Sequence, residues 1–241
     1  MFPYKIYHFN SLTSTQDKAK EFAKKGLSNV VVIADIQTRG RGRFKRKWFS
    51  SKGGLWLSIL LKPGKVENLQ YLTFVAAISV VKSIKKIANL NTNIKWHNDV
   101  HYKGKKLCGI LTEGIFGRDN HVIIGIGINV NQNIFPDEIK NTTVSLKMIK
   151  NKKINIKKLT KNIINEFFIL YCRYYDKNKF KNILRIWKIY CDTISKNVVV
   201  ITRTKKLSGK AIGVDSNCNL LLRLKNNKTA KIVEGDVNVR Y

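Results

Sequence analysis

The chain has 241 residues, 44% of them hydrophobic, so it can bury the core of one sizeable domain and a smaller second one. It has no apolar run long enough to span a bilayer and no signal-peptide pattern, which predicts a cytoplasmic protein, and its four scattered cysteines form no Cys-x-x-Cys pair, which argues against structural zinc and a disulfide framework. With 46 Lys and Arg against 15 Asp and Glu, the net charge is +31, a balance that attracts polyanions or an acidic protein.

The first half of the chain predicts helices and strands in alternation. Ser14 precedes apolar residues at helical spacing, and Gly26 follows them, which predicts a capped amphipathic helix. Apolar runs over 30–34 and 55–61 predict two buried strands, the second ended by Pro63-Gly64. The further elements expected here are a helix over 69–88, a strand over 94–96, a hairpin of strands 100–102 and 107–112 about Lys103-Gly104, and a strand over 122–130.

The second half changes texture at about residue 194. Before it, apolar periodicity predicts helices over 156–175 and 180–190. After it come five short strands separated by Asn, Gly or Lys turns, at 198–201, 209–214, 220–224, 231–233 and 237–240. We therefore expect two domains, 1–193 and 194–241, the second a small all-β barrel-like unit.

The segment from Gln37 to Trp48 reads Gln-Thr-Arg-Gly-Arg-Gly-Arg-Phe-Lys-Arg-Lys-Trp and directly follows a predicted strand. Its glycines, Gly40 and Gly42, allow the backbone to take positive φ and to bring N–H groups close to a ligand. Its arginines add fixed charge and forked donors that suit phosphate or carboxylate; they are Arg39, Arg41, Arg43 and Arg46. The segment predicts an anion-binding loop, with a solvated basic loop or a nucleic-acid contact as the alternative.

The lysines need a separate interpretation. They are spread along the whole chain and accompany abundant Asn and Ile, the composition that a strongly AT-rich genome produces. We interpret most of the net charge as compositional drift, while selection for polyanion binding stays open. Codon bias of that kind does not favour arginine, so the concentrated arginines are a separate signal.

Three further segments place ligand-type residues at strand ends. Residues 95–99 (Lys-Trp-His-Asn-Asp) combine a cation, an aromatic ring and a carboxylate, and residues 105–111 carry lysines where a turn enters a buried strand. Residues 125–129 (Gly-Ile-Gly-Ile-Asn) give a strand with one bare face, which usually admits another backbone or a flat ligand. Taken alone, each segment also fits an ordinary turn or tight sheet packing.

Together, and in this order, the segments resemble the biotin–protein ligase family over nearly the whole chain. The matching pieces are Ser14-Thr15-Gln16, Gln37 to Arg43 with Trp48, Lys95 to Asp99, Lys106 to Leu111, and Gly125 to Asn129, with Gly235-Asp236-Val237 ending an SH3-like unit. The resemblance implies an α+β fold with a mixed central sheet and flanking helices, of the class II synthetase-like type, followed by a small SH3-like β-barrel.

The resemblance also implies a two-step reaction. Biotin and ATP would form biotinyl-5′-AMP with release of pyrophosphate, and the biotinyl group would then pass to one lysine of a biotin carboxyl carrier protein. A carboxylate that attacks the α-phosphate brings negative charges together, so such a site needs fixed cations and usually Mg²⁺. The sequence does not identify the metal ligands, the acceptor protein or the oligomeric state, which is a monomer or a homodimer.

By similarity, the ureido head of biotin would meet Ser14, Thr15 and Gln37, the arginine loop would cover the carboxylate and phosphate, and Trp48 would face the adenine. The implied catalytic residues are Arg41, Arg43, Asp99 and Lys106. The implied biotin- and nucleotide-binding residues are Ser14, Thr15, Gln16, Gln37, Gly40, Arg41, Gly42, Arg43, Arg46, Trp48, Lys95, Asn98, Lys106, Gly109, Gly125, Gly127 and Asn129.

The chain departs from the family pattern at three positions. His97 stands where the family usually has proline, and we interpret it as a turn residue that could add a contact. Gln16 replaces the commoner asparagine, which leaves the contact of that position open, and Arg39 occupies a variable position. The Ser14-Thr15 segment begins so near the N-terminus that we expect no DNA-binding helix-turn-helix domain and no specific DNA binding.

Two other functions compete with this one. A lipoate–protein ligase or octanoyl transferase shares the catalytic fold and a pocket lysine but lacks the Gly-Arg-Gly-Arg loop followed by Trp. A nucleic-acid-binding protein would explain the charge of +31, but neither the bare strand 125–129 nor Lys106 at a hairpin end. Replacement of Lys106 by alanine separates these ideas, because a ligase should lose turnover severely, whereas general polyanion binding should barely change.

Overall fold

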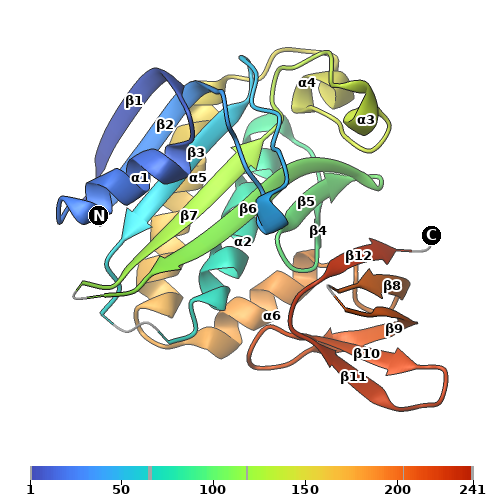
Figure 1. Cartoon of the computed structure of the whole chain (residues 1–241). Helices are drawn as coiled ribbons and strands as arrows, with labels where there is room; N and C mark the ends of the chain where they lie inside the picture. The colour runs from blue at the N-terminus through green and yellow to red at the C-terminus, as the bar shows by residue number, and fades with distance from the viewer. Residues whose placement is uncertain (1, 65–66, 118, 203, 240–241) are drawn as a thin grey trace.

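The computed structural model describes residues 2–64, 67–117, 119–202 and 204–239. Its main feature is a seven-stranded mixed sheet with helices on both faces, next to a five-stranded antiparallel sheet formed by the C-terminal part of the chain (Figure 1). This arrangement confirms the predicted α+β class.

The first sheet has the strand order β1-β2-β3-β7-β6-β5-β4, in which β1 and β2 are parallel and every other neighbouring pair is antiparallel. In chain order this part comprises β1 (Lys5–Leu12), α1 (Thr15–Lys24), β2 (Val30–Gln37), β3 (Leu55–Leu61), α2 (Gln70–Ala88), β4 (Asn93–Lys95), β5 (Asp99–Tyr102), β6 (Lys105–Ile115), β7 (His121–Ile128), α3 (Asp137–Lys140), α4 (Leu146–Lys150), α5 (Ile156–Leu170) with a π-helical continuation (Tyr171–Tyr175), and α6 (Phe180–Tyr190).

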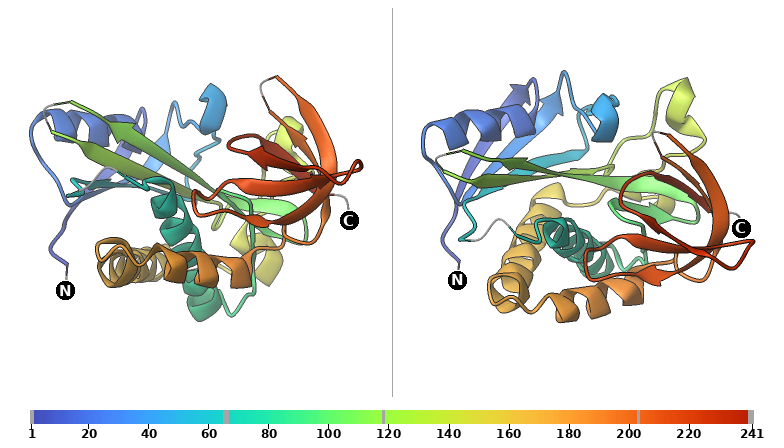
Figure 2. Two further views of the ribbon diagram at one scale, coloured as in Figure 1. Left: turned by 90° about the horizontal axis from the view of Figure 1, so that it is seen from below. Right: turned by 60° about the horizontal axis from the view of Figure 1, so that its bottom comes forward.

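The alternation of side chains along the central strands divides the core into two layers. Val122, Ile124, Ile126 and Ile128 of β7 point to one face, where they join α2 and α5 in the large core. On the other face Ile123 packs in a smaller core with Ala19 and Ala23 of α1. Helix α1 covers only part of that face (Figure 2), and residues of the remaining part, such as Gly125 and Gly127 of β7, line a cleft together with residues of the C-terminal unit.

The C-terminal unit contains β8 (Asn197–Ile201), β9 (Lys206–Val214), β10 (Leu220–Leu224), β11 (Thr229–Ile232) and β12 (Asp236–Val239), in the order β11-β10-β9-β8-β12. It is the expected small β-domain, although no ladder between β11 and β12 closes it into a barrel among the described residues. Trp96 joins the two units, since its Nε1 donates to Cys218 O (2.9 Å) and its N to Thr193 Oγ1 (2.9 Å).

Most predicted elements are confirmed, and the differences have local causes. Ser14 caps α1 as expected, and Lys103 and Gly104 form the hairpin turn with positive φ at both positions. Strand β1 was missed because it is an edge strand with mixed exposure, and α3 and α4 are too short to show periodicity. The predicted last strand extended to Arg240, which lies outside the described residues. No described helix is long and apolar enough to cross a membrane.

Candidate active site

A cleft of about 600 Å³ opens over the uncovered part of the sheet, between the arginine loop and the C-terminal unit. All but one of the predicted site residues line it, and the exception is Gly40. The lining residues among those predicted are Ser14, Thr15, Gln16, Gln37, Arg41, Gly42, Arg43, Arg46, Trp48, Lys95, Asn98, Asp99, Lys106, Gly109, Gly125, Gly127 and Asn129.

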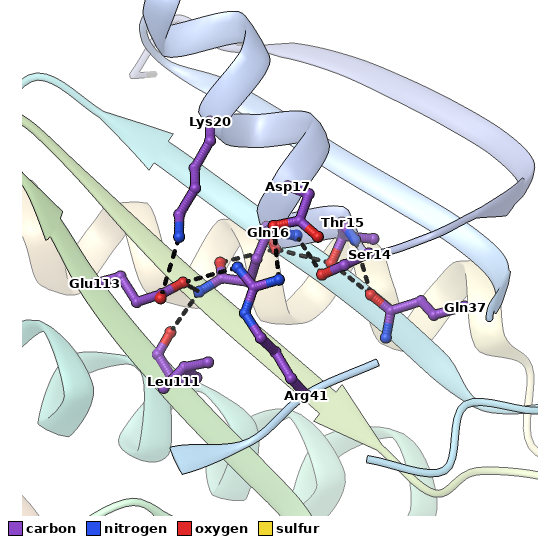
Figure 3. Close-up of polar contacts among 10 residues, drawn as sticks. Ser14, Thr15, Gln16, Asp17, Lys20, Gln37, Arg41, Leu111 and Glu113 are labelled. Carbon is purple, nitrogen blue, oxygen red and sulfur yellow. Dashed lines mark hydrogen bonds and ion pairs between the residues drawn. The ribbon is translucent and has the colours of Figure 1, made fainter. Parts of the chain in front are cut away.

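Five polar side chains form a connected row, called the polar row, which consists of Gln37, Thr15, Ser58, Gln16 and Glu113; Thr15, Gln16 and Gln37 line the cleft. Thr15 donates to Gln37 Oε1 through its N (2.8 Å) and its Oγ1 (3.0 Å). Ser58 Oγ lies 2.8 Å from Thr15 Oγ1 and 3.1 Å from Gln16 Oε1. Gln16 Nε2 donates to Glu113 Oε2 at 2.8 Å (Figure 3). Thr15, Ser58 and Gln16 are buried, so the hydrogen bonds among them are shielded from water, whereas Gln37 and Glu113 at the two ends of the row are half-buried.

The glycines of β7 explain why these side chains can lie flat on the sheet. Gly125 is paired with Ser58 of β3 on one side and with Leu111 of β6 on the other. A Cβ at Gly125 would come within 3.0 Å of the Gln16 side chain. The missing side chain therefore makes room for Gln16 to cross β7 and reach β6.

The second bare position of the floor is filled by Trp48. A Cβ at Gly127 would lie 2.5 Å from its Nε1, and one at Gly109 would lie 2.9 Å from its ring. Lys106 Nζ lies 5.2 Å from the centroid of the Trp48 ring. The bare strand was expected to admit a flat group, and that group is the indole of Trp48. The face of the indole that points away from the sheet is available to a second aromatic ring.

The three arginines of the loop that line the cleft, and Lys106, have carboxylate partners, whereas Lys47, which also lines the cleft, forms no ion pair with another described residue. The pairs are Arg41 Nη1 with Asp17 Oδ1 (2.6 Å), Arg41 Nη2 with Glu113 Oε2 (3.4 Å), Arg43 Nη2 with Asp236 Oδ1 (3.3 Å), Arg46 with Asp236, and Lys106 Nζ with Asp99 Oδ2 (2.8 Å). Arg43 also donates to Gly235 O (3.0 Å), so the C-terminal unit holds the loop from the far side of the cleft. An anion that enters would compete with these carboxylates.

Burial shapes the electrostatics around these pairs. It lowers the pKa of Arg43, partly offset by Asp99 and Asp236, and it also lowers the pKa of Lys95, partly offset by Asp99. Beneath the floor, burial raises the pKa of the Cys108 thiol, so that cysteine is an apolar packing group rather than a nucleophile.

Asp99 is the carboxylate best placed to meet a cation brought by a ligand. Its Oδ2 is paired with Lys106, whereas its Oδ1 is buried and has no hydrogen-bond partner among the described residues. The described residues contain no group of three or more His, Cys, Asp or Glu side chains that could hold a metal ion by themselves. The arrangement fits a metal that arrives with its own phosphate ligands.

Two expectations for the arginine loop were wrong. Gly42 has φ of −106°, and Gly40 is also outside the positive-φ region; Gly40 is needed instead because a Cβ there would lie 2.6 Å from Trp48 O. Positive φ occurs at Phe44 (55°) and Lys45 (59°), where the loop makes a 3-10 turn. Arg39 is exposed and lies outside the cleft lining.

The structure also places the side chains of His97 and Gln16, the two other positions at which the chain departs from the family pattern. His97 follows a cis peptide bond and its Nδ1 is buried without a partner among the described residues, in a smaller hollow beside Arg43. Burial, with Arg43 nearby, lowers the pKa of His97 to about 3, so its ring is neutral. Gln16 lies in the polar row between Ser58 and Glu113, which identifies the contacts that the sequence left open.

Four contributors to the site were not predicted: Asp17, Ser58, Glu113 and Asp236. Three are carboxylates, which in the sequence look like ordinary surface residues. Their spacing carries no signal, since Arg43 and Asp236 are 193 positions apart. Ser58 could have been noticed as a polar residue inside the apolar strand β3, where all seven residues are buried.

Comparisons with known proteins agree with the site. Residues 8–129 match the family model described as the biotin/lipoate A/B protein ligase family. Residues 193–240 match the model of the biotin protein ligase C-terminal domain.

Individual relatives extend the match over the chain. A bifunctional ligase/repressor BirA from Bacillus subtilis is 40% identical over 97% of this chain and 73% of its own length. A biotin–[acetyl-CoA-carboxylase] ligase from Mycobacterium tuberculosis is 32% identical over 50% of this chain and 46% of its own length. Among solved structures, a biotin protein ligase from Aquifex aeolicus in complex with biotin and ATP has a TM-score of 0.87 at 30% identity and covers 98% of both chains.

Proposed function

This chain belongs to the biotin/lipoate A/B protein ligase family, and we propose that it activates biotin with ATP as biotinyl-5′-AMP and transfers the biotinyl group to a lysine of a biotin carboxyl carrier protein. The solved relative that covers 98% of both chains is a biotin protein ligase in complex with biotin and ATP. The division into a ligase domain up to residue 193 and a C-terminal domain from residue 194 remains part of the proposal. No repressor role is carried over from the relative.

The polar row is the observation that supports biotin, rather than another acid, as the acyl substrate. Biotin ends in a ureido ring with N–H donors and a carbonyl acceptor, which can satisfy Thr15, Gln16 and Gln37. The hydrocarbon of octanoate or the dithiolane of lipoate would leave unused the hydrogen-bonding capacity of these side chains that their contacts within the protein do not fill. A site built for hydrogen bonds rejects a ligand that lacks them, commonly by a factor of about 10⁴ or more.

The first step joins two anions. An oxygen of the biotin carboxylate attacks the α-phosphorus of ATP, the new P–O bond forms an acyl phosphate anhydride, and the P–O bond to pyrophosphate breaks. Lys106 lines the same cleft as the polar row and lies over the Trp48 ring, so we place the meeting of the carboxylate and the phosphate at its Nζ. Arg43 supplies a second fixed charge from the loop. These cations would offset the repulsion that otherwise keeps the reactants apart.

The nucleotide would occupy the part of the cleft toward the C-terminal unit. The adenine would stack on the exposed face of Trp48, while Lys95, Arg46 and Asn129 would meet the ribose and phosphates. We propose that Mg²⁺ enters with ATP as part of the substrate and that Asp99 Oδ1 faces it. Mg²⁺ would supply charge neutralisation at the phosphates.

In the second step, the uncharged amine of the acceptor lysine attacks the acyl carbon of biotinyl-5′-AMP. An amide bond forms, AMP leaves with the electrons of the anhydride bond, and the amine gives up a proton. Asp99 would orient the incoming amine. The arginine loop, held to Asp236 of the C-terminal unit, would keep water from the reactive anhydride until the acceptor arrives.

The test is transfer of biotin to a purified carrier domain with ATP and Mg²⁺, read as the mass of the acceptor. We expect an ATP-dependent gain of one biotinyl group on a single lysine. Transfer of lipoate or octanoate instead would keep the fold and overturn the specificity. Absence of any acyl transfer would favour a polyanion-binding role for the basic loop.

A further inference from the structure

The carboxylate of Glu113 lies just behind the cleft and touches three side chains. Its Oε2 accepts from Gln16 Nε2 (2.8 Å) and Arg41 Nη2 (3.4 Å), and its Oε1 accepts from Lys20 Nζ (3.2 Å) (Figure 3). Glu113 itself does not line the cleft, whereas Gln16 does. Any influence of Glu113 on a ligand must therefore act through a neighbour.

The chemistry of its partners dictates which way the Gln16 amide points. Nε2 faces two groups that can only accept, Glu113 Oε2 and the carbonyl of Leu111 (3.3 Å), so the NH₂ end must lie there. Both amide hydrogens are used inside the protein. Oε1 faces Ser58 Oγ, and its remaining lone pair is the one hydrogen-bonding capacity that Gln16 can offer to a ligand.

We propose that Glu113 is a positioning residue for acyl-substrate specificity, which fixes the Gln16 amide so that the cleft presents an acceptor to an N–H group of the ureido head. This inference rests on the proposed biotin ligase function. Without the carboxylate, Leu111 O alone would hold Nε2 at 3.3 Å, and the amide could turn its NH₂ end toward the ligand. Gln16 would then offer a donor to a donor.

Arg41 does not account for the same effect. Its shorter contact is with Asp17 (2.6 Å), so that pair keeps the arginine in place when Glu113 is changed. Lys20 is a matched control, because it touches the same carboxylate from the half-exposed side and does not line the cleft. If Glu113 acts on ligand binding through its charge in general, removal of its partner Lys20 should also change the affinity for biotin. If Glu113 acts through the orientation of the Gln16 amide, removal of Lys20 should leave that affinity unchanged.

The experiment measures dissociation constants by calorimetry for biotin and for the two cyclic-carbamate analogues, in each of which an oxygen replaces one ureido N–H. The wild type should reject the analogue that places oxygen against Gln16 by at least about tenfold, because two acceptors then face each other. Glu113→Ala should weaken biotin about tenfold and bring biotin and that analogue to within about twofold. Lys20→Gln should keep the dissociation constants of biotin and of that analogue within about twofold of the wild-type values.

Two further variants keep the test decisive if the alanine variant folds poorly. Glu113→Gln retains an acceptor oxygen and should weaken biotin by only about two- to threefold. Gln16→Glu alone places two carboxylates together and should weaken biotin by more than tenfold, about 1.4 kcal/mol. Combined with Glu113→Gln, it restores one donor and one acceptor and should recover the wild-type rejection of the analogue.

The outcomes separate this inference from the function on which it rests. Failure of the wild type to bind biotin would overturn the proposed function and the role of Glu113 with it. Tight biotin binding by the wild type, with the same rejection of the analogue in Glu113→Ala, would overturn the role of Glu113 alone. The role of Glu113 would also be overturned if the double variant Gln16→Glu, Glu113→Gln discriminated between biotin and the analogue no better than Gln16→Glu alone. A pyrophosphate-exchange assay should show the change in KM for biotin, with kcat within about threefold.

Discussion

Four cations of the cleft differ from the cations of the outer helices in whether a carboxylate contacts them. In the cleft, Arg41, Arg43, Arg46 and Lys106 each contact a carboxylate. On α5 and α6, six exposed cations form no ion pair with another described residue; they are Lys157, Lys158, Lys161, Lys181, Arg185 and Lys188. The single acidic residue of these two helices, Glu166, pairs with Lys82 of α2.

The difference shows what the net charge of +31 can and cannot indicate. Arg41 and Arg43 are half-buried and held by carboxylates, so their positions are fixed, and an anion can take over the place of the carboxylate. Exposed lysines without partners are mobile, and salt screens them over about 10 Å. A binding site for anions is therefore recognised by its carboxylate partners and its burial rather than by the number of cations.

The largest effect should come from removal of the cation nearest the reacting groups. We expect Lys106→Ala to lower kcat/KM for biotin-dependent pyrophosphate exchange by about 10² or more, because a fixed donor to the developing charge is lost. The matched control is Lys158→Ala on the outer face of α5, which should change the rate by less than about twofold. Similar losses in the two variants would contradict the distinction between the regions.

Protonation of His97 would add a buried cation to the site, and its Nδ1 has no hydrogen-bond partner among the described residues. Burial, with Arg43 nearby, lowers the pKa of His97 to about 3, while the unfolded chain binds the proton near 6.5. The stability from keeping this ring neutral is therefore full above about pH 6.5 and declines as the pH falls toward 3. Between pH 7 and 5 we expect the wild type to lose about 1–2 kcal/mol relative to His97→Asn in urea unfolding. Parallel pH profiles of the two proteins would disprove the effect.

Removal of a carboxylate from the cleft should leave cations uncompensated. Asp236→Asn takes the partner from Arg43 and Arg46, and we expect the free energy of unfolding to fall by about 1 kcal/mol, or about 2–4 °C in Tm. Saturating ATP should narrow the difference in Tm between Asp236→Asn and the wild type, since phosphates then face the same arginines. Asp137→Asn breaks a pair with Lys140 that is highly exposed, and should change Tm by less than about 1 °C. Equal losses in both variants would contradict the comparison.

Lys45 of the arginine loop differs from the paired arginines, because it forms no ion pair with another described residue. Lys45 is exposed and has φ of 59°, a backbone conformation that glycine adopts without steric cost. Lys45→Gly should therefore raise the free energy of unfolding by about 0.5–1 kcal/mol and leave KM for ATP unchanged. Thermal unfolding and pyrophosphate exchange measure the two quantities. A several-fold rise in KM for ATP would show that this lysine belongs with the paired cations.

The smallest effect should come from the outer face. The attraction of an acidic carrier domain by the whole positive field predicts that kcat/KM for the acceptor falls as salt rises. Replacement of Lys157, Lys158 and Lys161 together by glutamine should lower it by about twofold or less at low salt and not at all at about 0.5 M salt. A kcat/KM for the acceptor that does not depend on salt would contradict a role of the charge in acceptor capture.

The elements with clear periodicity could be predicted from the sequence. Strand β3 has the predicted bounds, and α1 begins at the predicted Ser14 cap, because seven apolar residues in a row and a capped amphipathic stretch are strong local signals. Strand β1 gives no such signal, since it pairs on one side only and exposes polar residues. The strand is held in place by β2, which a local pattern cannot show.

The candidate site was predicted in part, for a similar reason. The arginine loop, the bare strand and Lys106 carry their chemistry in short segments, and the structure brings all of them to one cleft. The carboxylates that hold these cations come from distant segments, so Glu113 and Asp236 could be recognised only in the folded chain. The function of a glycine was also misjudged where close approach, rather than positive φ, requires it at Gly40.

The most direct test of biotin activation is ATP–pyrophosphate exchange by the purified chain, with biotin, lipoate and octanoate compared side by side. We expect exchange to depend on biotin and to be negligible with the other two acids, because only biotin satisfies the polar row. Exchange that is as fast with lipoate or octanoate as with biotin would contradict the account.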